Sequence, residues 1–235
     1  MLGKSWTFGI MCFNEVNSIG SVVKAVANIA EQITTDYEIL IVDDGSTDGS
    51  REKIQEIALE NSRVRFIFHQ GNAGIGQTLR SIYLNAQKEL VANIPADGQF
   101  DPADYLKIKD IPENSFISFF RKENSYYTLK RNLLSALNYY FNKFFLGITC
   151  NDINWTKVYY TADIQLAAPV LQSSLIETEL CAKLLFLKRN MIEIESHYLE
   201  RKFGTSKGSS FFILIAVMRE MLKVKLELIR FKRSL

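Results

Sequence analysis

The chain has 235 residues, enough to bury a sizeable core as one α/β domain. Hydrophobic residues make up 47% of it and charged residues 23%, as in an ordinary globular protein, and the net charge of +2 gives no case for nucleic-acid binding through overall charge. The longest apolar run, Phe211–Met218, is far shorter than the ~20 residues that span a bilayer. We therefore expect no transmembrane helix.

Cysteine usage indicates a reducing compartment. The three cysteines, Cys12, Cys150 and Cys181, are an odd number without metal-type spacing, and Cys12 and Cys181 lie in apolar runs typical of buried thiols. The first residues, Met1–Lys4, show no apolar signal-peptide region. Both observations favour a cytoplasmic protein.

The first hundred residues alternate strand-like and helix-like segments. Helical spacing of apolar residues predicts three helices, of which Asp48 or Ser50 could cap the second. Alternation of this kind predicts right-handed βαβ units and a mainly parallel sheet. The predicted strands are Trp6–Phe13, Tyr37–Val42, Val64–His69 and Leu90–Ile94, and the predicted helices are Ile19–Ile33, Arg51–Glu60 and Gln77–Lys88.

The second half is less regular, with no internal repeat and no convincing linker, which favours one domain. Asn154–Tyr160 is either a strand or a connector. The other predicted elements are strands at Ser115–Phe120 and Met191–Ser196 and helices at Thr128–Phe145, Ile176–Lys188 and Ser209–Leu235.

Polar residues gather where the predicted strands end. Ligands bind beyond the carboxyl ends of parallel strands, so four clusters at one edge are better evidence of a site than any single motif. The clusters are Asn14-Glu15, Asp43-Asp44, Gly71–Gly76 and Asp97–Gln99.

The run Asp43–Asp48 supplies carboxylates and hydroxyls on a turn that Gly45 permits. Such groups can hold the base or ribose of a nucleotide, and carboxylates can hold a divalent cation at a diphosphate. A polar surface turn that caps a helix draws on the same residues, and taken alone the two interpretations are about equal. The loop Gly71–Gly76 lacks the Lys and Ser/Thr of a P-loop, so its expected role is close backbone packing that shapes the pocket.

Taken together, these segments resemble glycosyltransferase family 2 with the GT-A fold, closest to its dolichyl-phosphate-mannose-synthase-like branch. The matches run in family order and cover nearly the whole chain to Lys207. They are CFNE (12–15), IVDDGSTDGS (41–50), QGNAGIGQTL (70–79), PADGQFDP (95–102), RNLLSALNYYFNKFFLG (131–147), ETELCAKLLFLKRN (177–190) and RKFGTSK (201–207).

The resemblance implies an α/β fold of GT-A type, with a Rossmann-like, mainly parallel sheet flanked by helices over residues 1–207 and a basic amphipathic helical tail over 208–235. It implies an inverting hexosyltransferase that takes a UDP- or GDP-sugar and uses Mg²⁺ or Mn²⁺. Asp97 matches the second Asp of the family's DxD metal motif, and Gln99 a further metal ligand. The other residues expected to bind the nucleotide-sugar are Asn14, Glu15, Asp43, Asp44, Gly45, Gly74, Gly98, Arg121 and Lys207. The residues expected to be catalytic are Asp97, Asp152, Arg131 and Arg201, and the four basic residues of the two groups are expected around phosphates.

The chain departs from the family pattern at two positions. Pro95 stands where the family has the first DxD aspartate, and Met11 stands where it usually has proline. Asp97 and Gln99 suffice if donor phosphates and water complete the shell, since Mg²⁺ commonly keeps only one or two carboxylates. Otherwise metal affinity is weakened or activity is lost, and the protein is a degenerate nucleotide-binding subunit that supports a partner.

The acceptor determines whether the reaction needs a base. A polyprenyl-phosphate acceptor, which the resemblance implies, already carries an ionised oxygen that can attack the anomeric carbon. A sugar hydroxyl in a polysaccharide or lipid-linked glycan needs a general base, for which Asp152 is the first candidate and Glu179 the second. The two histidines, His69 and His197, are expected to be structural.

The tail combines a broad apolar face with dense basic residues towards its end. This pattern fits a helix on an anionic membrane surface, and equally a helix that packs on its own domain or on a second subunit. The lipid acceptor implied by the resemblance favours a peripheral protein on the inner face of the membrane. The tail's basic residues are Arg219, Lys223, Lys225, Arg230, Lys232 and Arg233.

Overall fold

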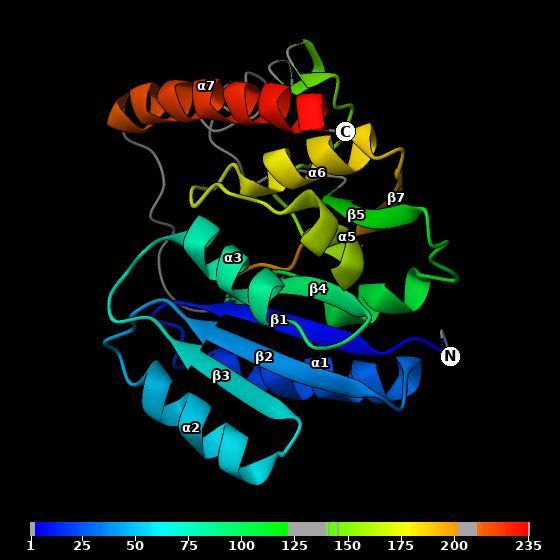
Figure 1. Ribbon diagram of the computed structural model, residues 1–235. Coiled ribbons are helices and arrows are strands. Elements are labelled where there is room, and N and C mark those ends of the chain that lie inside the picture. Colours follow the sequence, from blue (N-terminus) through cyan, green and yellow to red (C-terminus); the bar gives the residue numbers. More distant parts are fainter. Residues whose placement is uncertain (1–2, 122–139, 141, 145, 202–210, 235) are drawn as a thin grey trace.

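The computed structural model describes residues 3–121, 140, 142–144, 146–201 and 211–234, with one sheet between two layers of helices (Figure 1). The elements in chain order are β1 (Trp6–Cys12), α1 (Ile19–Ile33), β2 (Tyr37–Asp43), α2 (Ser50–Glu60), β3 (Val64–Phe68), α3 (Ile75–Asn85), β4 (Leu90–Pro95), the 3-10 helix η1 (Pro102–Lys107), β5 (Ser115–Arg121), β6 (Lys157–Tyr160), α5 (Thr161–Ala167), α6 (Ile176–Phe186), β7 (Asn190–Ser196) and α7 (Phe211–Ser234).

The sheet has seven strands in the order β3-β2-β1-β4-β6-β5-β7. Strands β1, β2, β3 and β4 run parallel to one another, and β5 runs parallel to β7. Strand β6 runs antiparallel to both β4 and β5. The prediction of a mainly parallel sheet is confirmed. The carboxyl ends of β1, β2, β3 and β4 consequently meet at one edge, on the left of Figure 1.

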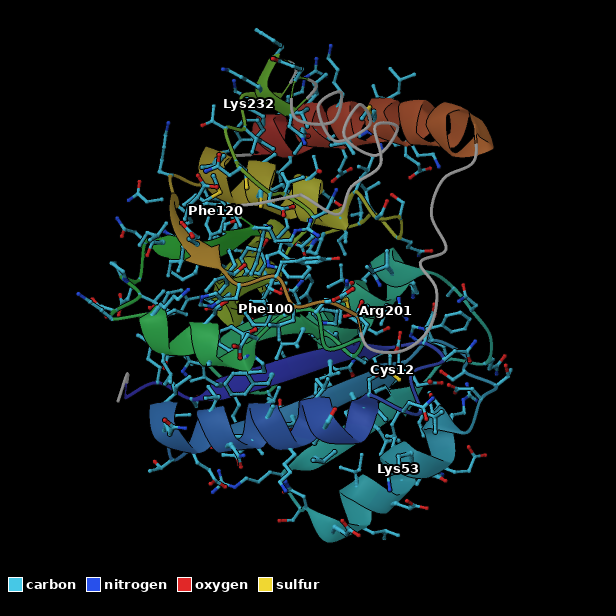
Figure 2. The ribbon with its side chains drawn as sticks, turned by 180° about the vertical axis from the view of Figure 1, so that it is seen from behind. Cys12, Lys53, Phe100, Phe120, Arg201 and Lys232 are labelled. Carbon is cyan, nitrogen blue, oxygen red and sulfur yellow. The ribbon has the colours of Figure 1, made fainter. Side chains whose placement is uncertain are left out.

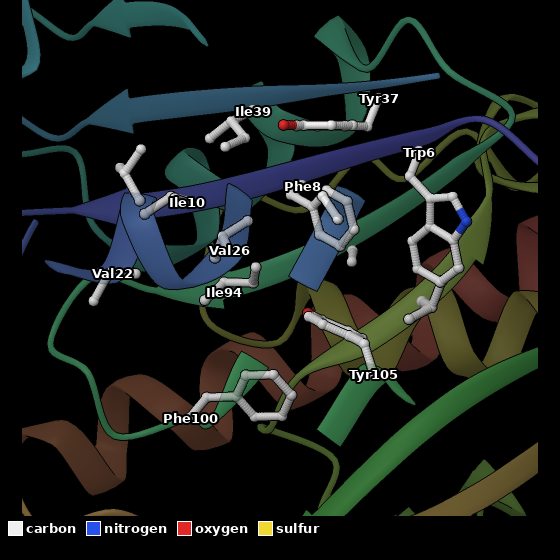
Figure 3. Packing of buried hydrophobic residues seen from close by; sticks show 14 of the residues in the cluster. Trp6, Phe8, Ile10, Val22, Val26, Tyr37, Ile39, Ile94, Phe100 and Tyr105 are labelled. Carbon is white, nitrogen blue, oxygen red and sulfur yellow. The ribbon is translucent and has the colours of Figure 1, made fainter. Parts of the chain in front are cut away.

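Alternating side chains on the strands build a core on each face of the sheet. Trp6, Phe8 and Ile10 point to the face that α1 and η1 cover, where they meet Val26 and Tyr105 (Figure 3). On the adjacent strand β2, Leu40 and Val42 point to the other face of the sheet, which α3, α5 and α6 cover. Because every second residue of a strand faces the same way, both faces of these central strands are apolar.

Helix α7 packs on α6 and completes the apolar core on that face of the sheet. Its Val224 and Leu228 are buried in that core, and Glu227 accepts a hydrogen bond of 3.0 Å from Nζ of the buried Lys183 on α6. One of the predicted arrangements, packing on the chain's own domain, is therefore confirmed for this face. Over the described residues, no helix combines the length and apolar character needed to cross a bilayer.

Several boundaries differ from the expected ones. Helix α3 starts two residues before the expected Gln77. Gly49 in the left-handed conformation precedes α2, and Asp48 Oδ1 accepts from the N–H of Ser50, the first residue of that helix, at 3.0 Å. The 3-10 helix η1 and helix α5 were not expected, since six or seven residues show too little periodicity. Of the expected helix 128–145, only residues 140 and 142–144 are described, and they are helical.

Candidate functional site

Two reciprocal hydrogen bonds join the end of β1 to the loop that follows β2. The backbone N–H of Asn14 donates to Ser46 Oγ (2.8 Å), and Asn14 Oδ1 accepts from the N–H of Thr47 (2.9 Å). Asn14 has a φ of 54°, which asparagine tolerates better than most residues. These hydrogen bonds join the end of β1 and the loop after β2 into one surface, called the platform below.

Glu15 lies beside this platform, and its carboxylate contacts a residue from the second half of the chain. Its carboxylate accepts from Ser18 Oγ (2.8 Å) and from Arg201. Burial raises the pKa of Glu15, and the Ser18 hydrogen bond and the Arg201 charge oppose that shift. Arg201 lies near Cys12 at the end of β1 (Figure 2), so it reaches the site across the sheet edge.

Asp43, the last residue of β2, is fully buried, and within the described part of the chain only one of its carboxylate oxygens is hydrogen-bonded. Oδ1 accepts from the N–H groups of Gly45 (3.1 Å) and Ser46 (3.0 Å) and from Nε of Arg51 (2.8 Å). Oδ2 is buried without a hydrogen-bond partner among the described residues. A buried carboxylate oxygen of this kind is costly unless a donor reaches it, which makes it a candidate acceptor for a ligand N–H or O–H.

Asp44 instead braces the glycine loop. Oδ1 accepts from the N–H of Ala73 (2.9 Å) and Oδ2 from that of Gly74 (2.8 Å). His69 Nδ1 also lies 2.9 Å from Oδ1, while its Nε2 lies 2.9 Å from Ser81 Oγ. His69 has the expected structural contacts, and both oxygens of Asp44 have partners within the protein.

Close backbone packing joins the loops after β2 and β3. Gly45 has a φ of +80°, and a Cβ there would lie 2.5 Å from the carbonyl carbon of Gly71 and 2.7 Å from the backbone nitrogen of Asn72. Gly76 packs in the same way against the segment before α6, since a Cβ added at Gly76 would lie 2.1 Å from the carbonyl oxygen of Ser173. These contacts fit the packing role expected for the glycine loop.

Asp97 and Gln99 share one tight turn after β4. Asp97 Oδ1 accepts from the N–H of Gln99 (3.0 Å), and Gly98 between them has a φ of +73°. Burial raises the pKa of Asp97, and the charge of Arg201, whose Nη1 lies 3.9 Å from Asp97 Oδ2, opposes that shift. The four carboxylates Glu15, Asp43, Asp44 and Asp97, together with the amide side chain of Asn14 beside them, are called the carboxylate cluster below.

This turn fits a divalent cation only in part. A carboxylate and an amide oxygen suit Mg²⁺ or Mn²⁺, and Mg²⁺ often takes few protein ligands beside substrate phosphates. Pro95 offers no side-chain ligand, and no group of three or more His, Cys, Asp or Glu side chains that could hold a metal occurs among the described residues. The residues therefore suit an ion that is completed by a bound phosphate group.

A second group of side chains surrounds Arg121 at the end of β5. Its Nε donates to Asp152 Oδ2 at 2.6 Å, and its guanidinium lies over the rings of Trp155 (4.3 Å) and Tyr198 (5.5 Å). Arg121, Asp152, Trp155 and Tyr198 are called the arginine cluster below. An arginine whose guanidinium lies over aromatic rings keeps a planar fork that can bind a phosphate or carboxylate.

The structure brings together most of the expected site residues. Twelve of them, all but Arg131 and Lys207, are in the described part of the chain, and those two lie outside it. Glu179, the second candidate base, is instead buried, where it accepts from the N–H groups of Val170 and Leu171 (both 2.9 Å). Sequence reasoning missed Trp155 and Tyr198, because single aromatic residues in irregular segments carry no periodic signal.

A sequence model of glycosyl transferase family 2 matches residues 7–149, more than half of the chain. The chain belongs to glycosyl transferase family 2. This family 2 chain is 26% identical over 216 residues to an undecaprenyl-phosphate 4-deoxy-4-formamido-L-arabinose transferase of Proteus mirabilis. The match covers 91% of this chain but 65% of that protein, so the chain spans slightly less than two thirds of its relative.

Solved structures share the fold of this chain. Glucosyl-3-phosphoglycerate synthase of Mycobacterium tuberculosis, solved with Mn²⁺, UDP and phosphoglyceric acid, has a TM-score of 0.64 at 16% identity, over 96% of this chain and 78% of that one. A mannosyltransferase of Pyrobaculum calidifontis, solved with GDP-Man and Mn²⁺, has a TM-score of 0.61 at 14% identity, over 83% and 56%. These likenesses confirm the predicted GT-A fold.

Proposed function

We propose that this family 2 protein is an inverting glycosyltransferase that moves a sugar from a nucleotide-sugar to a polyprenyl-phosphate-type lipid. The observation that carries the proposal is the carboxylate cluster, which gathers Asp43 and Asp97 at one sheet edge with Arg201 beside them. The undecaprenyl-phosphate transferase of Proteus mirabilis supports the lipid acceptor, and the neighbours solved with UDP or GDP-Man support the donor.

On the donor side, Asp43 offers its unpartnered oxygen to an N–H of the base or an O–H of the ribose. Asn14 and Gly45 belong to the platform beneath the nucleotide, with Glu15 beside it, while Asp44 holds Gly74 and its loop in place. The same groups could accept from uracil or guanine, so both UDP- and GDP-sugars remain candidates.

Asp97 and Gln99 would hold Mg²⁺ or Mn²⁺ together with the donor diphosphate, next to Gly98. Such an ion neutralises the charge that builds on the departing diphosphate. Arg201 adds a fixed positive charge beside Asp97, and we assign the same role to Arg131 and Lys207 from the family resemblance alone.

Arg121 lies beside Asp152, the residue expected on the acceptor side, so we assign it to the acceptor and not to the donor that the resemblance implies. In this role Arg121 binds the lipid phosphate and orients one of its oxygens for attack on the anomeric carbon. A phosphate oxygen is already ionised at neutral pH, so this reaction needs no general base. Asp152 then serves as the counter-ion that holds Arg121 in place. If the acceptor is a sugar hydroxyl, Asp152 is the candidate base.

Calorimetric titration with UDP and with GDP, each with and without Mn²⁺, tests the donor part of this proposal. We expect one nucleotide to bind more tightly with Mn²⁺, and Asp97→Ala to abolish that gain. Binding that ignores both Mn²⁺ and Asp97 points to the degenerate subunit suggested by Pro95. Transfer assays with a polyprenyl phosphate and with a glycan acceptor then separate the two transferase reactions.

We also propose that the tail, residues 208–235, holds the protein peripherally on the inner face of a membrane. Opposite the buried Val224 and Leu228, α7 exposes Leu222 (64%), Leu226 (58%) and Ile229 (42%) in one row. Exposed basic residues flank this row on both sides, which suits an anionic lipid surface. They are Lys223, Lys225, Arg230, Lys232 and Arg233.

Sedimentation with vesicles tests the membrane contact. We expect the protein to bind anionic vesicles at low salt and to lose that binding when Leu222 and Leu226 are both replaced by Glu. Leu59→Glu, at an 89% exposed leucine on α2, is the matched control and should bind as the wild type does. Wild-type protein that stays in the supernatant contradicts the membrane proposal.

A further inference from the structure

A short segment after β7 crosses the site and touches both of its clusters. Tyr198 forms an isolated antiparallel bridge with Phe100, and the N–H of Leu199 donates to the carbonyl oxygen of Gln99 at 2.9 Å. Three residues after Tyr198, Arg201 reaches Glu15 and Asp97. Backbone pairing thus fixes the segment 198–199 directly against the turn that carries Asp97 and Gln99.

The hydroxyl of Tyr198 sets the orientation of a side chain in that turn. Gln99 Nε2 donates a hydrogen bond to Tyr198 Oη, so the amide nitrogen is turned towards the tyrosine. Within the described part of the chain, no hydrogen bond to Gln99 Oε1 is formed. A divalent cation binds the amide oxygen and not the amide nitrogen, so this orientation leaves Gln99 Oε1 available to bind a metal ion.

The ring of Tyr198 has a second role in the arginine cluster. It lies 5.9 Å from the ring of Trp155 and 5.5 Å from the guanidinium carbon of Arg121, which also lies over Trp155. Ring contacts of this kind restrict the arginine without using its N–H groups. One residue therefore contacts the amide of Gln99 through its hydroxyl and the guanidinium of Arg121 through its ring.

We propose that Tyr198 is a positioning residue that aligns the donor and acceptor sides of the transfer reaction. Its hydroxyl turns Gln99 Oε1 towards the metal and diphosphate, and its ring holds Arg121 where the acceptor phosphate binds. This inference rests on the proposed function, since it assigns Gln99 to the donor side and Arg121 to the acceptor side.

Two substitutions at this position separate the two roles. Tyr198→Phe removes the hydroxyl and keeps the ring, so the Mn²⁺ concentration needed for half-maximal nucleotide binding should rise about tenfold, as for other groups that orient a metal ligand. The acceptor KM should stay within about twofold, because the ring contact with Arg121 is preserved. Tyr198→Leu removes both groups and should raise the Mn²⁺ requirement and the acceptor KM together.

Tyr160→Phe is the matched control for the loss of a tyrosine hydroxyl. Tyr160 is buried, and its hydroxyl donates to the carbonyl oxygen of Ile111 at 2.6 Å, so its loss affects stability alone. Metal dependence measured as nucleotide binding by calorimetry does not require turnover. Unfolding midpoints of all three variants identify any general loss of structure.

The outcomes distinguish this inference from the proposed function. If the wild type binds nucleotide with Mn²⁺ and Tyr198→Phe has the same Mn²⁺ requirement, the role of Tyr198 is overturned while the proposed function stands. The role is also overturned if Tyr160→Phe raises the Mn²⁺ requirement as much as Tyr198→Phe does. If wild-type protein binds neither UDP nor GDP with Mn²⁺, the proposed function itself fails.

Discussion

The two clusters of the site are built in different ways. The carboxylate cluster is held mainly by backbone N–H groups, such as those of Gly45 and Ser46 at Asp43 and those of Ala73 and Gly74 at Asp44. Among the described residues, the arginine cluster is held mainly by side chains, through one ion pair and two aromatic rings. Every residue except proline keeps a backbone N–H, so most substitutions leave such donors in place, whereas each side-chain contact can be removed by a single substitution.

The largest effect is expected where the backbone framework itself is disturbed. Gly45→Ala places a methyl group within 2.5 Å of the Gly71 backbone at a φ of +80°, so the loops must separate. We expect a loss of about 3 kcal/mol in the free energy of unfolding, with loss of nucleotide binding. Urea unfolding and calorimetry measure the two effects.

Gly20→Ala in α1 is the control for that substitution. A Cβ at Gly20 meets only Lys53 Cε, at 3.8 Å. Alanine in a helix is favoured over glycine, so this variant should gain about 0.5–1 kcal/mol. If Gly45→Ala unfolds at the same urea concentration as the wild type, the two loops are not packed as described.

The second effect concerns the unpartnered oxygen of Asp43. Asp43→Asn keeps one oxygen for the loop N–H groups and replaces an acceptor with an NH₂ donor. The dissociation constant of the preferred nucleotide should rise about 30-fold, the value of one hydrogen bond to a charged group. The acceptor KM at saturating donor should not change. If the acceptor KM changes while the nucleotide dissociation constant does not, the assignment of Asp43 to the donor side is contradicted.

A smaller effect is expected in the arginine cluster. Arg121→Lys keeps the charge but loses the planar fork that lies 4.3 Å from the Trp155 ring, so the acceptor KM should rise about tenfold with unchanged nucleotide affinity. Arg65→Lys, on the edge strand β3, is the matched control and should leave both constants unchanged. If nucleotide affinity changes more than the acceptor KM, Arg121 does not act on the acceptor side alone, and the division into two clusters is contradicted.

The smallest effect lies at the opposite end of the sheet, at the buried Glu38. Burial opposes ionisation there, but hydrogen bonds from Arg65 and Thr7 outweigh it and lower the pKa of Glu38. A pKa lowered by folding adds stability above the unfolded value of 4.5, and that stability is lost as pH falls through the folded value.

Glu38→Gln should therefore cost about 1–2 kcal/mol of unfolding free energy at about pH 7, and the difference should shrink towards about pH 3. Urea unfolding at several pH values measures it. Nucleotide binding should be unaffected, because Glu38 lies at the start of β2, away from both clusters. A difference in unfolding free energy that stays constant with pH contradicts the pKa argument.

The difference between the clusters also explains what could be predicted from sequence. Asp43 and Asp97 were found because strand periodicity locates strand ends, and parallel strands bring those ends together. Tyr198 contacts Gln99 across 99 positions of the chain, and no local pattern encodes such a contact. Resemblance supplied the roles of Arg121 and Arg201, but not the ion pair of Arg121 with Asp152 or the aromatic rings beside it.

The contact between Lys183 and α7 has a practical consequence for protein engineering. Lys183 is 1% exposed and has carboxylate partners in Glu179 (2.7 Å) and Glu227 (3.0 Å), of which the second belongs to α7. A chain shortened after Lys207 loses Glu227 and uncovers the apolar residues beneath Val224 and Leu228. Such a truncated protein is prone to aggregate, so its failure to bind vesicles says nothing about lipid, and point substitutions on the outer row of α7 are the sounder choice.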